Sequence, residues 1–452
     1  MIATTYYNRI KSHKKFLAVV FCFLFFTYII SATPYFSGTM GIGGQFQPII
    51  DERPNLLMDS YFAGQFDLSN NLFLRTGLSI FTTESIVNDS FFQNTPAIFS
   101  LDELSLTYRG SVGELSHFLG VYIGEYDPVG SDIFLQRQFG IPSFASRLTE
   151  SICGVSRAKI YEMSGIGGTY LIKLPQNVTF GANLYYNKVK DFNLTTNSQT
   201  ENTLFTQNEN YTSDNSFIES LNVDLRFAGA WNTAVLDFAV GFTMPMKKQI
   251  ILDDGNSQDV ILLIERADMH AGLTAFLGSS NSSSLLFQAG FSKLIIDPTK
   301  VKDDKVLSFD DVYLLVEPRF VSKNMNLSIA LFNMPTSTRE NLFHVKDPVG
   351  VSISLYTPWL SLSGNKSQFG LMATISSSKT LENLIAENET SKTEENPELL
   401  GDSNLYISPY GTIHIGTGKL NFSLNVNALD IKDFEKLLSN ISIIAGYKVS
   451  LW

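Results

Sequence analysis

Acidic and basic side chains recur two positions apart in segments whose intervening positions are apolar. Asp224 and Arg226 form one such pair, and Glu317 and Arg319 form another. Residues two apart in an extended chain point to the same side, so each pair presents both signs of charge on one face. Such a face can hold hydrated ions and solutes, or it can simply face water in a soluble sheet. The candidates for this polar face are Asp59, Arg75, Glu103, Arg109, Asp224, Arg226, Asp237, Asp268, Glu317 and Arg319.

Catalytic and metal-binding patterns are weak in this chain. Asp268 and His270 share a strand face and could act as general acid and base. No nucleophile pattern accompanies them, so we predict no catalytic residues and no enzyme. No phosphate-binding GxxxxGK[ST] loop and no Cys/His metal spacing is present. The run 253–256 (DDGN) could attract calcium, but a solvated loop is the better interpretation. We therefore expect no cofactor and no metal.

The residues around these charges predict β-strands joined as hairpins. Segments 57–68 and 72–82 each alternate between apolar and polar positions, and Ser69-Asn70-Asn71 between them favours a tight turn. Each segment has about 11 residues, enough to span a bilayer at the usual tilt. Further strands are predicted at 39–46, 99–109, 115–125, 168–174, 178–190, 217–227, 234–242, 267–277, 285–295, 312–321, 325–333, 349–357, 369–377, 405–415, 420–431 and 440–452.

This pattern predicts an all-β protein, a single antiparallel up-and-down transmembrane barrel. We expect about 18 strands, within a range of about 14 to 18, with short periplasmic turns and long extracellular loops. Closure hides the sheet edges that would otherwise stay unpaired. A barrel of this width encloses a lumen that wall side chains alone cannot fill, so the strand count points to a pore.

The last predicted strand resembles the C-terminal insertion signal of bacterial outer-membrane β-barrels. Gly446, Val449 and Leu451 occupy the positions of that signal, and Trp452 lies one place out of phase. The resemblance is to the porin-like class, and it extends over the mature chain through pattern rather than through specific motifs. It implies that the barrel-insertion machinery recognises this strand.

The first residues have the layout of a secretory signal peptide. A basic cluster, 9–15, precedes an apolar run, 16–30, and small residues at 31–33 follow. We expect a signal peptide at 1–32 and the barrel at 33–452; an uncleaved anchor is the alternative. Cys22 lies inside the apolar run, so we interpret it as part of the signal core rather than as a lipoprotein cysteine. Only Cys153 then remains, and no internal disulfide can form.

The composition fits a surface that is partly in lipid. The net charge is −11, with 12% aromatic and 17% charged residues. The charged fraction is below the usual quarter or so. An acidic chain is a poor ligand for phosphate backbones, so nucleic acid is not an expected partner.

The longest predicted link, 126–167, resembles the third loop of general porins, which folds inward and narrows the channel. Pro128, Gly130 and Gly140 interrupt regular structure within it. A surface loop, or an extra hairpin through 155–161, is the alternative. The candidate constriction residues are Asp132, Arg137, Arg147 and Glu150.

These observations predict an exported protein of the outer membrane of a diderm bacterium that lets small solutes diffuse passively through a water-filled barrel. Its expected partners are the lipid bilayer, the insertion machinery and the solutes. Three alternatives stay open: a plugged transporter for hydrophobic compounds, a surface adhesin or structural barrel, and a soluble secreted β-protein. The solute, its charge and the oligomeric state do not follow from the sequence.

Overall fold

The structure is a computed structural model of the 452-residue chain. It describes residues 35–48, 54–82, 85–86, 97–151, 153, 159–190, 216–251, 257–261, 267–279, 282–295, 311–339, 342, 344–381, 403–429 and 441–451. The predicted signal peptide and Trp452 lie outside these residues.

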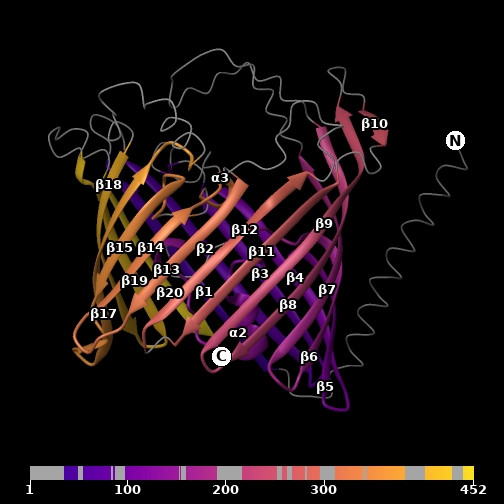
Figure 1. Cartoon of the computed structure of the whole chain (residues 1–452), viewed down its shortest axis with the longest axis horizontal. Helices are drawn as coiled ribbons and strands as arrows, with labels where there is room; N and C mark the ends of the chain where they lie inside the picture. The colour runs from indigo at the N-terminus through magenta and orange to yellow at the C-terminus, as the bar shows by residue number, and fades with distance from the viewer. Residues whose placement is uncertain are drawn as a thin grey trace, which may run out of the picture.

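One antiparallel sheet contains every named strand (Figure 1). The strands are β1 (Tyr35–Gln47), β2 (Asn55–Ser69), β3 (Leu72–Thr82), β4 (Ala97–Val112), β5 (Leu115–Glu125), β6 (Ser164–Leu174), β7 (Val178–Lys190), β8 (Ser216–Trp231), β9 (Ala234–Ile251), β10 (Ser257–Ile261), β11 (Asp268–Gly278), β12 (Ser284–Ile295), β13 (Val312–Phe320), β14 (Asn326–Asn333), β15 (Val349–Tyr356), β16 (Leu360–Leu362), β17 (Asn365–Ser377), β18 (Ser403–Ile415), β19 (Gly418–Asn427) and β20 (Ser442–Leu451).

Eighteen of these strands form the wall of a closed barrel. Neighbours in the chain pair with each other, and β20 closes the ring by pairing with β1 from Gly38↔Leu451 to Phe46↔Ile443. The short strands β10 and β16 extend single hairpins at the rims, since β10 pairs only with β9 and β16 only with β17. Removing these two from the 20 strands of the sheet leaves the 18 of the wall.

The predicted fold class is therefore confirmed, and each wall strand coincides with a predicted one. The ends differ in places. Strand β9 runs on to Ile251 and pairs with β10, although the predicted strand ends at residue 242. The alternation of side chains continues as far as Lys247, but Pro245 and the acidic residues at 253 and 254 argued against a strand in the sequence. Within the described residues, no helix has both the length and the apolar character needed to cross a membrane.

The outer face of the wall is apolar. On β5, Leu119 and Val121 are 59% and 60% exposed, whereas Tyr122, the next residue of the same strand, points inward and is 2% exposed. Exposed apolar side chains alternate in this way with buried ones on most strands. A band of outward Leu, Val, Ile and Phe suits hydrocarbon, and the closed ladder leaves no unpaired edge in it.

The core lies inside the barrel. The chain between β5 and β6 folds back into the ring and carries the helix α2 (Ile133–Phe139) and the 3-10 turn η1 (Arg147–Thr149). A second short helix, α3 (Thr336–Arg339), follows β14. Apolar residues of the segment 126–163, hereafter the inner loop, pack against inward residues of the wall. The fully buried members include Val129, Phe134, Leu135, Leu148, Met163, Leu286, Tyr313 and Leu315.

Candidate functional site: the inner loop and two lumen cavities

Helix α2 is bounded by residues that stop regular structure. Gly130 has φ +97° shortly before the helix, and Gly140 ends it at φ 66°, in the left-handed region that glycine adopts without strain. Phe134, Leu135 and Gln138 are its buried residues. The helix thus places an apolar side against the wall and leaves Arg137 free to reach across the lumen.

The inner loop is held on one side by an ion pair of β8 and β9. Arg226 donates to both carboxylate oxygens of Asp237, at 2.8 and 2.6 Å, and its remaining nitrogen donates to the backbone oxygen of Asp127 at 2.6 Å. The guanidinium carbon also lies 3.7 Å from the centre of the Phe134 ring. A bidentate pair of this kind fixes geometry as well as charge, so Arg226 ties the loop to the wall.

The loop is held further round the ring by close packing on β11 and β12. Gly272 and Gly290 pair across these strands, and Val129 and Ile160 of the loop approach them. A Cβ on Gly272 would lie 2.6 Å from Val129, and one on Gly290 would lie 2.4 Å from Ile160. The two glycines form a flat floor on which the loop rests.

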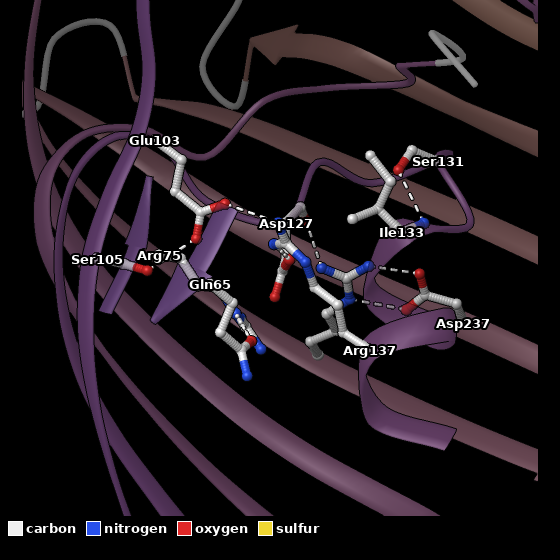
Figure 2. Close-up of polar contacts among 10 residues, drawn as sticks. Gln65, Arg75, Glu103, Ser105, Asp127, Ser131, Ile133, Arg137 and Asp237 are labelled. Carbon is white, nitrogen blue, oxygen red and sulfur yellow. Dashed lines mark hydrogen bonds and ion pairs between the residues drawn. The ribbon is translucent and has the colours of Figure 1, made fainter. Parts of the chain in front are cut away.

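Arg137 forms the polar centre of the site. Its guanidinium donates to Glu103 of β4 at 2.9 Å and to Asp127 of the loop. Figure 2 shows Glu103 approaching this group from the wall, with Arg75 and Gln65 beside it. Burial alone would raise the pKa of Asp127, but the charges of Arg137, Arg75 and Arg226 outweigh it and lower that pKa. Asp127 is therefore an anion.

Lys159 forms two further ion pairs at the end of the loop that precedes β6. Lys159 donates to Glu125 at 2.5 Å and to Glu162 at 2.7 Å. Burial would lower the pKa of Lys159, but the two carboxylates prevail and raise it. The hydroxyl of Thr338 in α3 donates to the backbone oxygen of Lys159 at 2.9 Å. This end of the loop is thus attached to β5 through Glu125 and to α3 through Thr338.

Two adjoining cavities lie between the described parts of the inner loop and the wall. The larger, which we call the upper cavity, has a volume of about 1090 Å³ and extends along β1–β4 to Phe81 and Ser100. The smaller, the lower vestibule, has about 610 Å³ and reaches the short β2–β3 turn at Ser69 and Asn70. The lining residues common to both cavities are Tyr35, Gln65, Arg75 and Arg137, so the cavities adjoin at these side chains.

The two cavities differ in charge. The upper cavity is lined by the carboxylates Asp102, Glu103, Glu125, Asp127, Asp132, Glu150 and Glu162 and by the cations Arg75, Arg137, Lys159, Arg319, Lys419 and Lys448. The lower vestibule is lined by the cations Arg75, Arg109, Arg137 and Lys173 and by one carboxylate, Asp67. Both signs occur in the first cavity, whereas positive charge dominates the second.

The ten candidates for the polar face all lie on the inward side of their strands, but they do not form one surface. Arg75, Glu103, Arg109 and Arg319 line the cavities. Asp224 and Asp237 are fully buried, in contacts with His270 at 2.8 Å and with Arg226. Asp59 and Glu317 are also buried. Asp268 lies at the start of β11, beyond the lining of either cavity.

The four loop candidates lie on the inner loop as follows. Asp132 accepts from the Ser143 hydroxyl at 2.6 Å and from the Phe144 backbone at 3.0 Å, which closes the loop on itself. Arg147 pairs with Glu150 at 3.0 Å and lies 4.3 Å from the centre of the Tyr410 ring. Asp132, Arg137 and Glu150 line the upper cavity.

The residues of the predicted insertion signal lie on the strand that closes the barrel. On β20, Gly446, Val449 and Leu451 pair with Gly43, Met40 and Gly38 of β1.

Gln65, Lys173 and Lys448 line the cavities but were not among the predicted site residues. Gln65 shares the phase of Asp59 on β2 and could have been found in that way, whereas β6, β20 and the strands that pair with them carry no polar-face candidate that would point to Lys173 or Lys448. Helix α2 was not predicted either, because its seven residues are too few to show a period. Among the described residues, no group of three His, Cys, Asp or Glu side chains could hold a metal ion.

In comparisons with known proteins, this chain is similar to solved structures but matches neither a protein-family model nor a curated protein. Salmonella typhi OmpF in complex with daunomycin is 11% identical, with a TM-score of 0.38, over 92% of this chain and 97% of its own. Pseudomonas putida OprB is 10% identical, with a TM-score of 0.37, over 94% and 95%. A mutant of the Rh. blastica porin is 8% identical, with a TM-score of 0.39, over 93% and 100%.

Proposed function

We propose that this protein is an outer-membrane channel for passive diffusion of small water-soluble solutes. The path runs along β1–β6, beside the inner loop, from the upper cavity into the lower vestibule. The observation that carries the proposal is the junction of the two cavities at Tyr35, Gln65, Arg75 and Arg137. The inner loop sets the width of the path, with Arg137 at its narrowest level.

The charge of the lining supports diffusion of polar rather than hydrophobic solutes. A transporter for hydrophobic compounds would need an apolar passage, yet ionic groups from six wall strands and from the loop surround this one. In such a passage the fixed charges stay hydrated and set the transverse field that acts on a passing solute. The adhesin alternative depends on the long links, which lie largely outside the described residues.

Site-directed chemical block at the junction tests this proposal. Gln65→Cys places a thiol where the two cavities adjoin, and a bulky charged methanethiosulfonate reagent should then reduce the current through the purified protein in a planar bilayer. Phe66→Cys is the matched control, because Phe66 is the next residue of β2 and is 36% exposed on the outer face. The response of the wild type to the reagent gives the baseline, since its Cys153 is buried.

We expect ohmic current in the wild type, block of the Gln65→Cys variant and no block of the Phe66→Cys variant. Absence of any current from folded wild-type protein would overturn the proposed channel. Equal block of both variants, or of neither, would overturn the proposed path.

A further inference from the structure

We propose that the lower vestibule selects for small anions, so that this channel carries anionic solutes in preference to cations. The inference rests on the proposed channel function and names the class of solute that the channel favours. Neither the net charge of the chain, which is −11, nor the mixed charges of the upper cavity would suggest it.

The first support is the number of cations that lack a carboxylate partner. Four cations and one carboxylate line the vestibule. Among the described residues, Arg137 forms ion pairs with Glu103 and Asp127, and the other three have no carboxylate oxygen within 4.0 Å. The charge of Arg75 also acts on Asp127, whereas the charges of Arg109 and Lys173 are left to the cavity.

The second support is how these cations are held. Arg75 lies 4.9 Å from the centre of the Phe73 ring, Arg109 lies 6.0 Å from that of Phe118, and Lys173 lies 5.1 Å from that of Phe139. An aromatic face orients a cation without neutralising it. Arg75 and Arg109 are thereby held at the wall, whereas Lys173, which also donates to the backbone oxygen of Gln138, is held against α2 of the inner loop. None of these contacts supplies a countercharge.

The third support is that the vestibule keeps its single carboxylate away from the cations. Gln65 stands between them, because its amide donates to Asp67 at 2.9 Å while its oxygen accepts from Arg75 at 3.0 Å. Arg109 and Lys173 are close enough to repel each other. An anion in the vestibule relieves that repulsion, and a cation adds to it.

The volume limits the solute to a small one. A cavity of about 610 Å³ accommodates an inorganic anion with its water or a short organic acid. Carboxylates and phosphates present the same chemistry to guanidinium and ammonium groups, and both belong to the proposed class.

Reversal potentials of the purified protein in a planar bilayer under a KCl gradient test the inference. We expect the wild type to favour chloride over potassium. Arg109→Gln and Lys173→Gln should each shift the reversal potential toward the cation side, and the double variant should shift it further. Lys323→Gln is the matched control, because Lys323 is an exposed residue between β13 and β14 and does not line the vestibule; it should cause no shift.

Two further arms identify the origin of selectivity and the class of anion. Because the Debye length falls from about 10 Å at 0.1 M salt to about 3 Å at 1 M, the preference should weaken at high salt. Replacing chloride by succinate or by inorganic phosphate should retain an anion current that the Arg109 and Lys173 variants reduce.

The outcomes separate the two proposals. If the folded protein gives no current, the channel itself fails. If it conducts but favours potassium, or if the Arg109 and Lys173 variants shift the reversal potential no more than Lys323→Gln does, anion selection fails while the channel stands. If only succinate or only inorganic phosphate carries current, the proposed class of solute is reduced to carboxylates or to phosphates, respectively.

Discussion

At the scale of single residues, the described part of the lumen contains charges that are paired with carboxylates and hold the inner loop, and cations without a carboxylate partner that line the lower vestibule. Arg226 belongs to the first kind. It is buried, it spans both oxygens of Asp237, and it donates to the backbone of Asp127. Arg109 and Lys173 belong to the second kind. The two kinds should respond differently to substitution, because loss of the first kind leaves a buried carboxylate without a countercharge.

Arg226→Met should therefore destabilise the folded barrel. The substitution leaves Asp237 buried without a countercharge, a loss of about 3–5 kcal/mol in comparable buried pairs. Urea unfolding in lipid vesicles measures it. The double variant Arg226→Met/Asp237→Leu is the matched control and should recover a large part of the loss. Equal stability of the single variant and the wild type would contradict a structural role for this pair.

His344, in the link that precedes β15, predicts a dependence of stability on pH. Burial, with the charges of Arg147 and Lys346, lowers the pKa of His344 to about 3. The unfolded imidazole titrates near 6.5. Between these values the unfolded chain binds the extra proton, so the free energy of unfolding falls as pH falls through this window. The slope contributed by this residue is at most about 1.4 kcal/mol per pH unit.

Urea titrations at several pH values between 4 and 7 (roughly the window in which the histidine titrates) check this expectation. His344→Gln has no titrating group and should lose stability less steeply on acidification than the wild type. Parallel pH slopes for the two proteins would show that His344 is not buried as a neutral ring.

The residue scale is also where the sequence predicts least. The alternation of side chains places all ten polar candidates on the inward face, but it does not distinguish Arg109, at an open cavity, from Asp224, which is fully buried against His270. That difference arises from the inner loop, which covers some wall residues and not others. Contacts between residues 99 or 158 positions apart, such as Arg226–Asp127 and Gln288–Gly130, leave no local signal.

At the scale of elements, the inner loop behaves as a docked unit with its own apolar core. Phe144 stacks on Phe276 of β11, with ring centres 4.9 Å apart, and Leu286, Tyr313 and Leu315 point inward to meet it. These inward apolar residues depart from a lumen that is polar throughout. Apolar wall residues point inward here because the inner loop carries apolar side chains that are stabilised when they are buried away from water.

Substitution in the glycine floor should displace this unit. Gly272→Val adds atoms where a Cβ alone would already lie 2.6 Å from Val129, so the loop must shift inward or detach. Single-channel recordings should then show a changed mean conductance and more current noise than the wild type. Ala271→Val is the matched control, because it enlarges the next residue of β11 on the outer face; it should leave the recordings unchanged. Identical recordings for both variants would contradict docking at this floor.

The strands themselves were the most predictable elements. Period-two patterning and Asn- or Gly-containing turns identify every wall strand, because each strand separates an apolar outside from a different inside. Helix α2 could not be predicted from periodic patterning. Its place follows from Arg137, Phe134 and Leu135 finding partners across the lumen, not from helical periodicity.

At the scale of the whole molecule, the closed ring of 18 strands sorts its residues by the medium they meet. Val121→Arg tests that sorting. A basic residue on the lipid face costs about 2–4 kcal/mol near mid-depth. The fraction of folded, heat-modifiable protein after refolding into vesicles should fall accordingly. Val121→Phe, apolar at the same position, should refold like the wild type. Equal refolding of the two variants would show that this face is not in hydrocarbon.

The central claim is that the inner loop narrows a water-filled path, and deleting its middle tests that claim most directly. Residues 133–146 can be replaced by a short glycine linker, because the Asp132 carboxylate accepts from the Phe144 backbone at 3.0 Å, so the chain returns to Asp132 three residues before Arg147, where the deletion ends. The measurement is single-channel conductance of the purified variant beside the wild type, with heat-modifiable migration as the check on folding. The account predicts a larger conductance in the variant. A folded variant with a conductance equal to or smaller than that of the wild type would contradict it.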